Sequence, residues 1–249
     1  MASRLKLIVA YDGAPFSGWQ SQPNGNGVQD HLEKAFAQIG GSGVRVHGAG
    51  RTDAGVHALA QCAHVDLASK RYTSDRWRSA LNGVLPSTIR ILRCRFVAAT
   101  FHARFSATAK IYRYRIWNTE VLPPLEEGRA WHVRELLNFA AMSRAARLFL
   151  GRHDFASFAA NRGAPVTDTV RTLRRLQLRR AGPLISLELE GDGFLYKMAR
   201  LIAGALVQVG FGNATAADLE ERLRHPEKKL SQGRIVAPAG GLFLVRVRY

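Results

Sequence analysis

The chain has 249 residues, of which 47% are hydrophobic, and this is enough for one large domain or two smaller ones with a real core. It carries 36 Lys+Arg against 19 Asp+Glu, a formal net charge of +17, which favours a nucleic acid as partner over an acidic small substrate or a membrane surface. The absence of any apolar run of about 18 residues argues against a transmembrane helix. The short apolar stretch at the N-terminus predicts a first strand rather than a signal peptide. Cys62 and Cys94 are isolated, so we expect no disulfide framework, no zinc site and a reducing cytoplasm.

The first half of the chain reads as strand, helix, strand, strand, helix, strand. Apolar alternation predicts the strands and apolar residues at helical spacing predict the helices. The predicted strands cover residues 5–12, 44–47, 57–67 and 89–97, and the predicted helices cover residues 28–39 and 74–84. Thr73 or Ser74 is expected to cap the second helix.

The second half has a similar content, although no internal sequence repeat is visible. Its predicted elements are a strand at 110–118, a helix at 135–150, an irregular piece at 153–158, a polar loop at 161–169, a hairpin of 170–180 and 184–190, helices at 195–209 and 216–224, and a last strand at 241–249. Neither half alternates strand and helix as a doubly wound sheet does. The predicted fold class is α+β, with two similar halves, 1–104 and 105–249, each a mostly antiparallel sheet with helices on one side.

Residues 48–58 (GAGRTDAGVHA) place one carboxylate, Asp53, in a turn between two strand-like runs. Three glycines and three alanines among these eleven residues suggest room for a bulky ligand beside the backbone. An aspartate that only hydrogen-bonds its own turn is the structural alternative. A catalytic aspartate has to stay ionised, and a nearby cation favours the charged form. The candidate cations are Arg51, Lys197 and Arg200.

Aromatic and basic residues suggest how nucleic acid is bound. Tyr112 and Tyr114 share one face of the strand at 110–118, where they could stack on a base or simply fill the core. Residues 101–105 (FHARF) combine aromatic and cationic groups, which suits stacking together with phosphate contact. The histidines show no metal-ligand spacing, and there is no P-loop or Rossmann fingerprint, so we expect neither a metal nor a nucleotide cofactor.

The ordered motifs resemble the TruA-type tRNA pseudouridine synthase family. The signature is residues 50–58 (GRTDAGVHA). Further motifs that agree in order and cover nearly the whole chain are 11–13 (YDG), 18–20 (GWQ), 28–29 (VQ), 101–107 (FHARFSA), 112–114 (YRY), 154–158 (DFASF), 198–200 (MAR) and 241–245 (GLFLV). The order and spacing of these short motifs make the resemblance specific.

The resemblance implies isomerisation of uridine to pseudouridine at positions 38, 39 and 40 of the tRNA anticodon stem-loop, by a cytoplasmic homodimer without a cofactor. It implies two α+β halves around a basic cleft, the pseudouridine synthase fold. Asp53 matches the catalytic aspartate, Arg51 the arginine that assists base flipping, and Tyr112 the tyrosine that stacks on the target uracil. Arg200 falls where the family supplies a cation to the aspartate. The implied RNA contacts are Arg71, Phe101, His102, Arg104 and Phe105, together with the loop at 161–169.

Several alternatives stay open. Asp53 could attack C1′ of the ribose or remove the C2′ proton, and the residues do not choose between these steps. A non-catalytic RNA-binding protein would explain the charge and the tyrosines, although it gives no reason for an acid that faces RNA. A uracil glycosylase would release free uracil and leave an abasic product.

Overall fold

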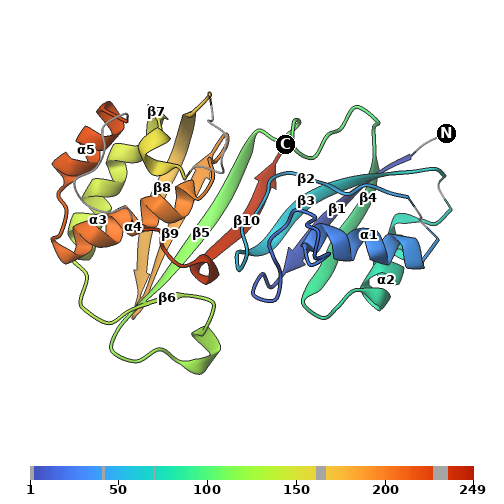
Figure 1. Ribbon diagram of the computed structural model, residues 1–249, viewed down its shortest axis with the longest axis horizontal. Coiled ribbons are helices and arrows are strands. Elements are labelled where there is room, and N and C mark those ends of the chain that lie inside the picture. Colours follow the sequence, from blue (N-terminus) through green and yellow to red (C-terminus); the bar gives the residue numbers. More distant parts are fainter. Residues whose placement is uncertain (1–2, 41–42, 70, 161–166, 227–234) are drawn as a thin grey trace. The chain divides into compact units, whose positions relative to one another are not determined.

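The computed structural model describes residues 3–40, 43–69, 71–160, 167–226 and 235–249, which form two compact units (Figure 1). The first unit is Met1–Thr108 with Phe243–Tyr249, and the second is Ala109–Leu242. The sequence pattern predicts a boundary at 104/105 and a last strand in the second half; the division observed here differs on both points. The last strand belongs to the first unit, where it pairs with the strand that begins at His57, a long-range partner that local patterning does not specify.

The sheet of the first unit has the strand order β4-β1-β3-β10. Its strands are β1 (Ser3–Tyr11), β2 (His47–Gly48), β3 (His57–Leu67), β4 (Ile89–Val97) and β10 (Leu242–Arg248). β1 pairs antiparallel with both β3 and β4, β2 pairs antiparallel with β3, and β10 runs parallel to β3. The antiparallel strands predicted for this half are therefore confirmed.

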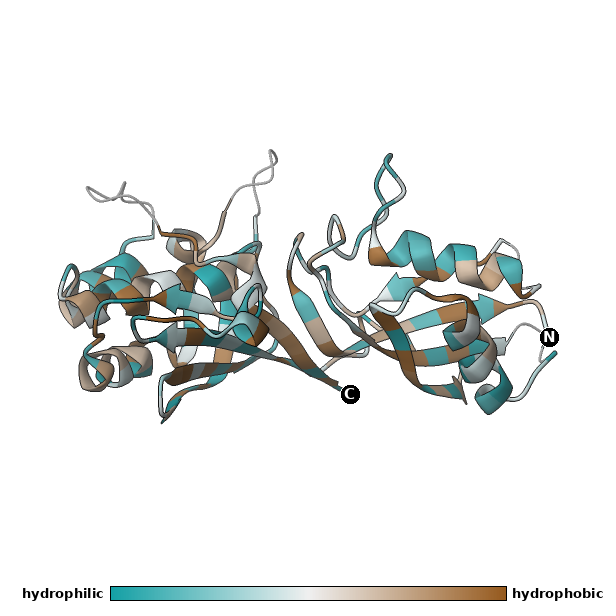
Figure 2. Cartoon of the chain, turned by 90° about the horizontal axis from the view of Figure 1, so that it is seen from below, coloured by the Kyte–Doolittle hydropathy of each residue, from teal (hydrophilic) through white to brown (hydrophobic). Residues whose placement is uncertain are grey.

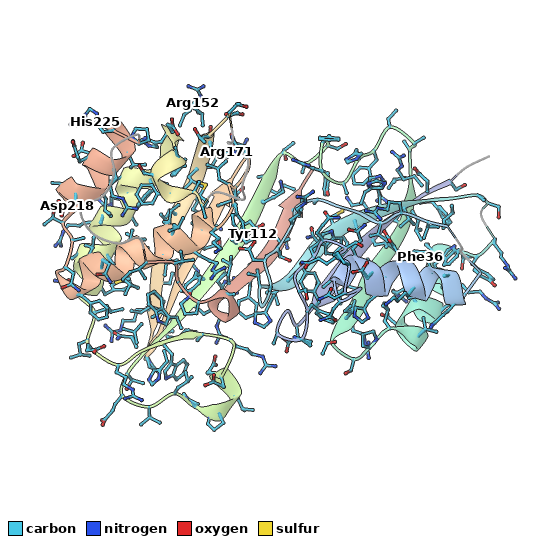
Figure 3. The ribbon with its side chains drawn as sticks, viewed as in Figure 1. Phe36, Tyr112, Arg152, Arg171, Asp218 and His225 are labelled. Atoms are coloured by element: carbon cyan, nitrogen blue, oxygen red, sulfur yellow. The ribbon has the colours of Figure 1, made fainter. Side chains whose placement is uncertain are left out.

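Two helices complete the first unit, α1 (Val28–Gln38) and α2 (Ser74–Val84). The Thr73 side chain accepts a hydrogen bond from the Arg76 N–H and so caps α2, as its sequence predicts. Phe36 of α1, labelled in Figure 3, packs on Trp77 of α2 with ring centroids 5.3 Å apart. These fully buried rings join the helices and anchor the core of this unit.

The second unit has the strand order β5-β9-β8-β7, all antiparallel, with β6 parallel to the end of β5. Its strands are β5 (Ala109–Asn118), β6 (Trp131–Val133), β7 (Gly151–Asp154), β8 (Val170–Ala181) and β9 (Leu184–Gly191). Its helices are α3 (Phe139–Ala146), α4 (Met198–Phe211) and α5 (Ala216–Arg224), and its short 3₁₀ turns are η1 (Pro124–Glu126), η2 (Arg147–Phe149), η3 (Ala156–Phe158) and η4 (Ala239–Gly241).

The two faces of these strands differ in burial. On β9, Ile185, Leu187 and Leu189 are buried, whereas Glu188 and Glu190 on the other face are partly exposed. Alternation of this kind appears as brown and teal bands along the strands in Figure 2. α4 is buried along most of its length. The predicted α+β class with mostly antiparallel strands is confirmed.

Several predicted helices and strands begin or end at other residues than expected. The helix predicted from 135 begins at Phe139, because the Asn138 side chain accepts from the Ala141 N–H and caps it there. The helix predicted from 195 begins at Met198, after Lys197 in a left-handed conformation. Only His47–Gly48 forms a strand where 44–47 was expected. The strands β6 and β7 were not predicted, and residues 161–166 of the expected loop lie outside the described residues.

No helix in the described part of the chain is both long enough and apolar enough to cross a membrane.

Candidate functional site

Asp53 lies in the turn that leads from β2 into β3. The Val56 N–H donates to the Asp53 carbonyl oxygen over 3.1 Å and closes the turn, and Gly55 takes a left-handed φ of +77°. The Asp53 side chain is partly exposed, Arg51 is exposed, and Thr52 between them is buried. The turn therefore presents a carboxylate and a guanidinium on a backbone that is anchored through Thr52.

Side chains and backbone from earlier in the chain hold this turn. The Trp19 N–H donates to the Thr52 carbonyl oxygen over 3.0 Å, and the hydroxyls of Tyr11 and Thr52 are 2.8 Å apart. A Cβ on Gly18 would lie 2.6 Å from the Thr52 carbonyl oxygen, so the two segments pack backbone against backbone. Burial raises the pKa of Tyr11 above its usual range.

The small residues around Asp53 also serve packing. A Cβ on Gly48 would lie 2.5 Å from the Trp19 ring, so this space is occupied by the protein itself. The Gln61 side-chain amide donates to the Gly50 carbonyl oxygen over 2.8 Å. Part of the room that the sequence suggests for a ligand is thus filled by Trp19, and the glycines bring the turn close to its support.

His57, which the residue pattern did not mark as a site residue, supports the turn from its other end. The Gly13 N–H donates to His57 Nδ1 over 3.0 Å, and the Asp12 carboxylate lies 3.1 Å from the same nitrogen. The imidazole is buried and stacks on Phe243 with centroids 4.6 Å apart. Its place in the signature, four residues after Asp53, was the feature of the sequence that could have marked His57 as a site residue. The end of β1 and the start of β10 together fix where β3 begins.

Tyr112 and Tyr114 lie on β5 of the second unit and have different surroundings. Tyr112, labelled in Figure 3, is 6% exposed, and its ring meets Phe194 edge-on at 4.8 Å. Tyr114 is fully buried, and its hydroxyl donates to the Pro238 carbonyl oxygen over 2.8 Å. Burial raises the pKa of Tyr114 above its usual range. Tyr114 therefore fills the core, as the structural alternative predicts.

Arg200 lies in the first turn of α4, in the second unit. Its Nε donates to the Ala237 carbonyl oxygen over 2.7 Å, and the Ala237 N–H donates back to the Arg200 carbonyl oxygen over 3.2 Å. Asp53 and Arg51 belong to the first unit, whereas Tyr112 and Arg200 belong to the second. A pairing of Arg200 with Asp53 stays a prediction.

Four of the expected RNA contacts come together in one turn of the first unit. His102 Nδ1 accepts from the N–H groups of Arg104 and Phe105 over 3.1 and 3.2 Å. Phe105 is 76% exposed, its ring centroid is 4.3 Å from that of His102, and the Arg104 guanidinium lies 5.6 Å from it. Phe101 is partly buried, with the Lys6 ammonium 4.6 Å from its ring.

Arg71, the fifth expected contact, belongs to a separate cluster at the start of α2. Its guanidinium lies 5.1 Å from the Tyr72 ring, and that of Arg76 lies 5.3 Å from the same ring. Arg71 and Arg76 are both exposed. Two cations around one aromatic ring form a surface suited to phosphate contact.

Three histidines, His47, His64 and His102, form a cluster with ring centroids 4.7 to 5.9 Å apart, in which His47 stacks on His64 and the His102 ring is inclined to both. Within the described ranges no group of three or more His, Cys, Asp or Glu side chains is arranged to hold a metal ion. Burial, followed by the charges of Arg4, His102 and His47, lowers the pKa of His64 to about 4. The cluster therefore contains a neutral imidazole at physiological pH.

The buried His64 should make the protein acid-sensitive. Its pKa is lowered in the folded protein from an ordinary value of 6.5 to about 4, so between these two pH values the unfolded chain binds a proton that the folded protein does not bind. The free energy of unfolding should fall as the pH drops from about 6.5 towards 4, and urea denaturation across this range measures it. His64→Gln should show a shallower fall. An equal slope in both proteins would contradict this assignment.

Comparisons with known proteins identify the family. A family model described as "tRNA pseudouridine synthase" matches residues 7–106 and 145–249. The chain is 43% identical to the "tRNA pseudouridine synthase A" of Akkermansia muciniphila over 99% of its own length and 95% of that protein. It is 44% identical to the protein of the same name from Afipia carboxidovorans over 99% of both chains, and 42% identical to that from Acetivibrio thermocellus over 98% and 99%. On this near full-length similarity, which includes the Asp53 turn and its supports, the chain belongs to the tRNA pseudouridine synthase family.

Proposed function

We propose that this protein isomerises uridine to pseudouridine at positions 38, 39 and 40 in the anticodon stem-loop of tRNA. The observation that carries the proposal is the Asp53 turn, which presents a partly exposed carboxylate on a backbone clamped by Trp19 and Tyr11 in a chain of this family. The net charge of +17 supports a polyanionic substrate.

The reaction breaks the bond between N1 of uracil and C1′ of ribose and joins C1′ to C5. The proton on C5 is lost and N1 gains one, so the product has the mass of the substrate. A paired base has to leave the helix first, at a cost of a few kcal/mol. Asp53 acts as an ionised carboxylate, either by attack on C1′ or by removal of the C2′ proton, and its fixed backbone limits the reorganisation needed.

Arg51 assists base flipping in this proposal. Arg51 is exposed two residues before Asp53, so its guanidinium can occupy the space that the flipped nucleotide leaves. Arg51→Ala should keep much of the affinity for tRNA and lower turnover about 100-fold or more, because a few kcal/mol of unstacking is no longer offset. Single-turnover rates and tRNA binding measure the two effects. Equal turnover in both proteins would refute the role in flipping.

Tyr112 and Arg200 serve the same nucleotide from the second unit. The detached uracil has to stay bound while it turns, and an aromatic ring such as Tyr112 can stack on it throughout. The edge-on contact with Phe194 holds that ring in place. Arg200 supplies a cation that favours the ionised form of Asp53. No metal or cofactor is needed for this set of roles.

The rest of the tRNA is held by Arg71 and by the turn that contains Phe101, His102, Arg104 and Phe105. These residues combine guanidinium groups with aromatic rings, as phosphate contact and base stacking require. We place the active form, a homodimer, in the cytoplasm, where tRNA is modified.

Incubation of an unmodified anticodon stem-loop with the purified protein, followed by nucleoside analysis, tests the proposal. Pseudouridine at the three positions is the expected result. Free uracil with an abasic product would indicate a glycosylase, and unchanged RNA that stays bound would indicate a non-catalytic RNA-binding protein. Either result would overturn the proposed function.

A further inference from the structure

Side chains from other elements fasten the backbone of residues 98–106, called here the 98–106 turn. The Arg4 guanidinium donates to the carbonyl oxygens of Ala99 and Phe101 over 2.5 and 2.7 Å. The same guanidinium is bound through two hydrogen bonds of 2.8 Å to the Asp66 carboxylate. One end of the turn is therefore tied to β1 and β3.

Ala103, at the centre of the turn, is held on both sides. Its N–H donates to His64 Nδ1 over 3.1 Å, and its carbonyl oxygen accepts from the Tyr249 hydroxyl over 2.7 Å. Ala103 is fully buried, so each of these groups would be costly to leave without a partner. His64 comes from β3 and Tyr249 follows β10, so the two bonds clamp the turn between distant parts of the first unit.

The Tyr249 ring is itself fixed, and His64 is kept in the required protonation state. The Lys6 ammonium lies 3.9 Å from the Tyr249 ring, and the Phe101 ring is 4.9 Å from it. Because its pKa is lowered, the His64 imidazole is neutral at neutral pH. Its Nδ1 can therefore remain without a proton and accept the hydrogen bond from the Ala103 N–H. Both clamps are thus preformed before any ligand arrives.

The clamped turn carries Arg104 and Phe105, and both side chains are exposed. A ring as exposed as Phe105 gains nothing from the core, and it is held instead against His102 and Arg104. Fixing the backbone below such groups lowers the entropy lost when they bind a partner. The turn is therefore built to present a cation and a ring in one arrangement.

We propose that Tyr249 and His64 are positioning residues, which hold the 98–106 turn in the shape that binds RNA and so set the affinity for tRNA without touching the target uridine. This inference rests on the proposed function, because that function makes RNA the partner of Arg104 and Phe105. Neither side chain takes part in the chemistry at Asp53.

Tyr249→Phe tests the clamp, because it removes the hydroxyl and keeps the ring. We expect the KM and Kd for an unmodified anticodon stem-loop to rise about three- to tenfold, as for the loss of one hydrogen bond to the carbonyl of a buried residue, with kcat changed less than about twofold. The Ala103 amide should also exchange its hydrogen faster. Ser87→Ala is the control, since it removes an exposed hydroxyl from the same unit, between α2 and β4, and it should leave KM unchanged.

A pair of His64 variants gives a second measurement that does not depend on the folding of Tyr249→Phe. His64→Gln keeps an acceptor for the Ala103 N–H and should retain affinity, whereas His64→Leu should lose it. Wild-type Kd, KM and Ala103 exchange in Tyr249→Phe would overturn the inference. If the wild-type protein binds the RNA without forming pseudouridine, the proposed function fails, and a weaker Kd in Tyr249→Phe still supports the clamp. A wild-type protein that does not bind the RNA would refute both.

Discussion

Replacement of Asp53 with asparagine should abolish pseudouridine formation, by at least about a thousandfold, while the fold and tRNA binding persist. Asparagine has the size and shape of aspartate, and the turn is closed by a hydrogen bond between backbone groups of Val56 and Asp53, which asparagine keeps. An amide carries no charge and is neither a useful nucleophile nor a base, so both open routes at the ribose fail. Nucleoside analysis after single turnover measures the loss, and circular dichroism and Kd measurements check the fold and the binding.

Asp75→Asn is the matched control for this loss. Asp75 is an exposed carboxylate at the start of α2 in the same unit, where it pairs with Arg78 over 3.3 Å. Its neutralisation should leave the rate unchanged, because a surface ion pair contributes little. Measurable pseudouridine from purified Asp53→Asn would remove Asp53 from the mechanism.

Replacement of Gly13 with alanine should damage both stability and activity. The new Cβ would lie 2.1 Å from the Val56 carbonyl oxygen, and backbone cannot swing away as the end of a flexible side chain can. The end of β1 would have to separate from Val56 and His57, which breaks the Gly13 hydrogen bond to His57 and shifts the support of the Asp53 turn. We expect a loss of about 2 kcal/mol or more in the free energy of unfolding, with a fall in kcat.

Gly83→Ala shows what the same change does where space is open. Gly83 lies within α2, and nothing stands within 4 Å of the Cβ that alanine would add. Alanine favours the helix there by up to about 1 kcal/mol, so Gly83→Ala should be neutral or stabilising. Urea denaturation compares the two variants. If Gly13→Ala were as stable as the wild-type protein, the close approach of β1 to Val56 would play no supporting part.

Local patterning predicted the larger elements well. The strands at 57–67 and 89–97 and the helices at 74–84 and 216–224 have the predicted bounds, because alternation, helical spacing and caps such as Thr73 are properties of neighbouring residues. The short strands β6 and β7 escaped prediction, because three or four residues become a strand only when a partner strand lies alongside. The pairing of β10 with its distant partner β3 was hidden from local patterning for the same reason.

The same distinction between local and long-range features applies to the candidate site. The signature around Asp53, with Arg51 two residues before it, was visible in the chain itself, and so were the family and the preference for a polyanion that follows from the charge. The supports of the site were not visible: Trp19 against Thr52, Gly13 against His57, and Tyr249 against Ala103. Each of these contacts joins residues far apart in sequence, and composition and spacing carry no information about such pairs. The chain by itself therefore determined the family and the candidate residues for the chemistry, and only the tertiary structure decided what holds these residues, because a hydrogen bond between distant segments exists only once the fold has brought them together.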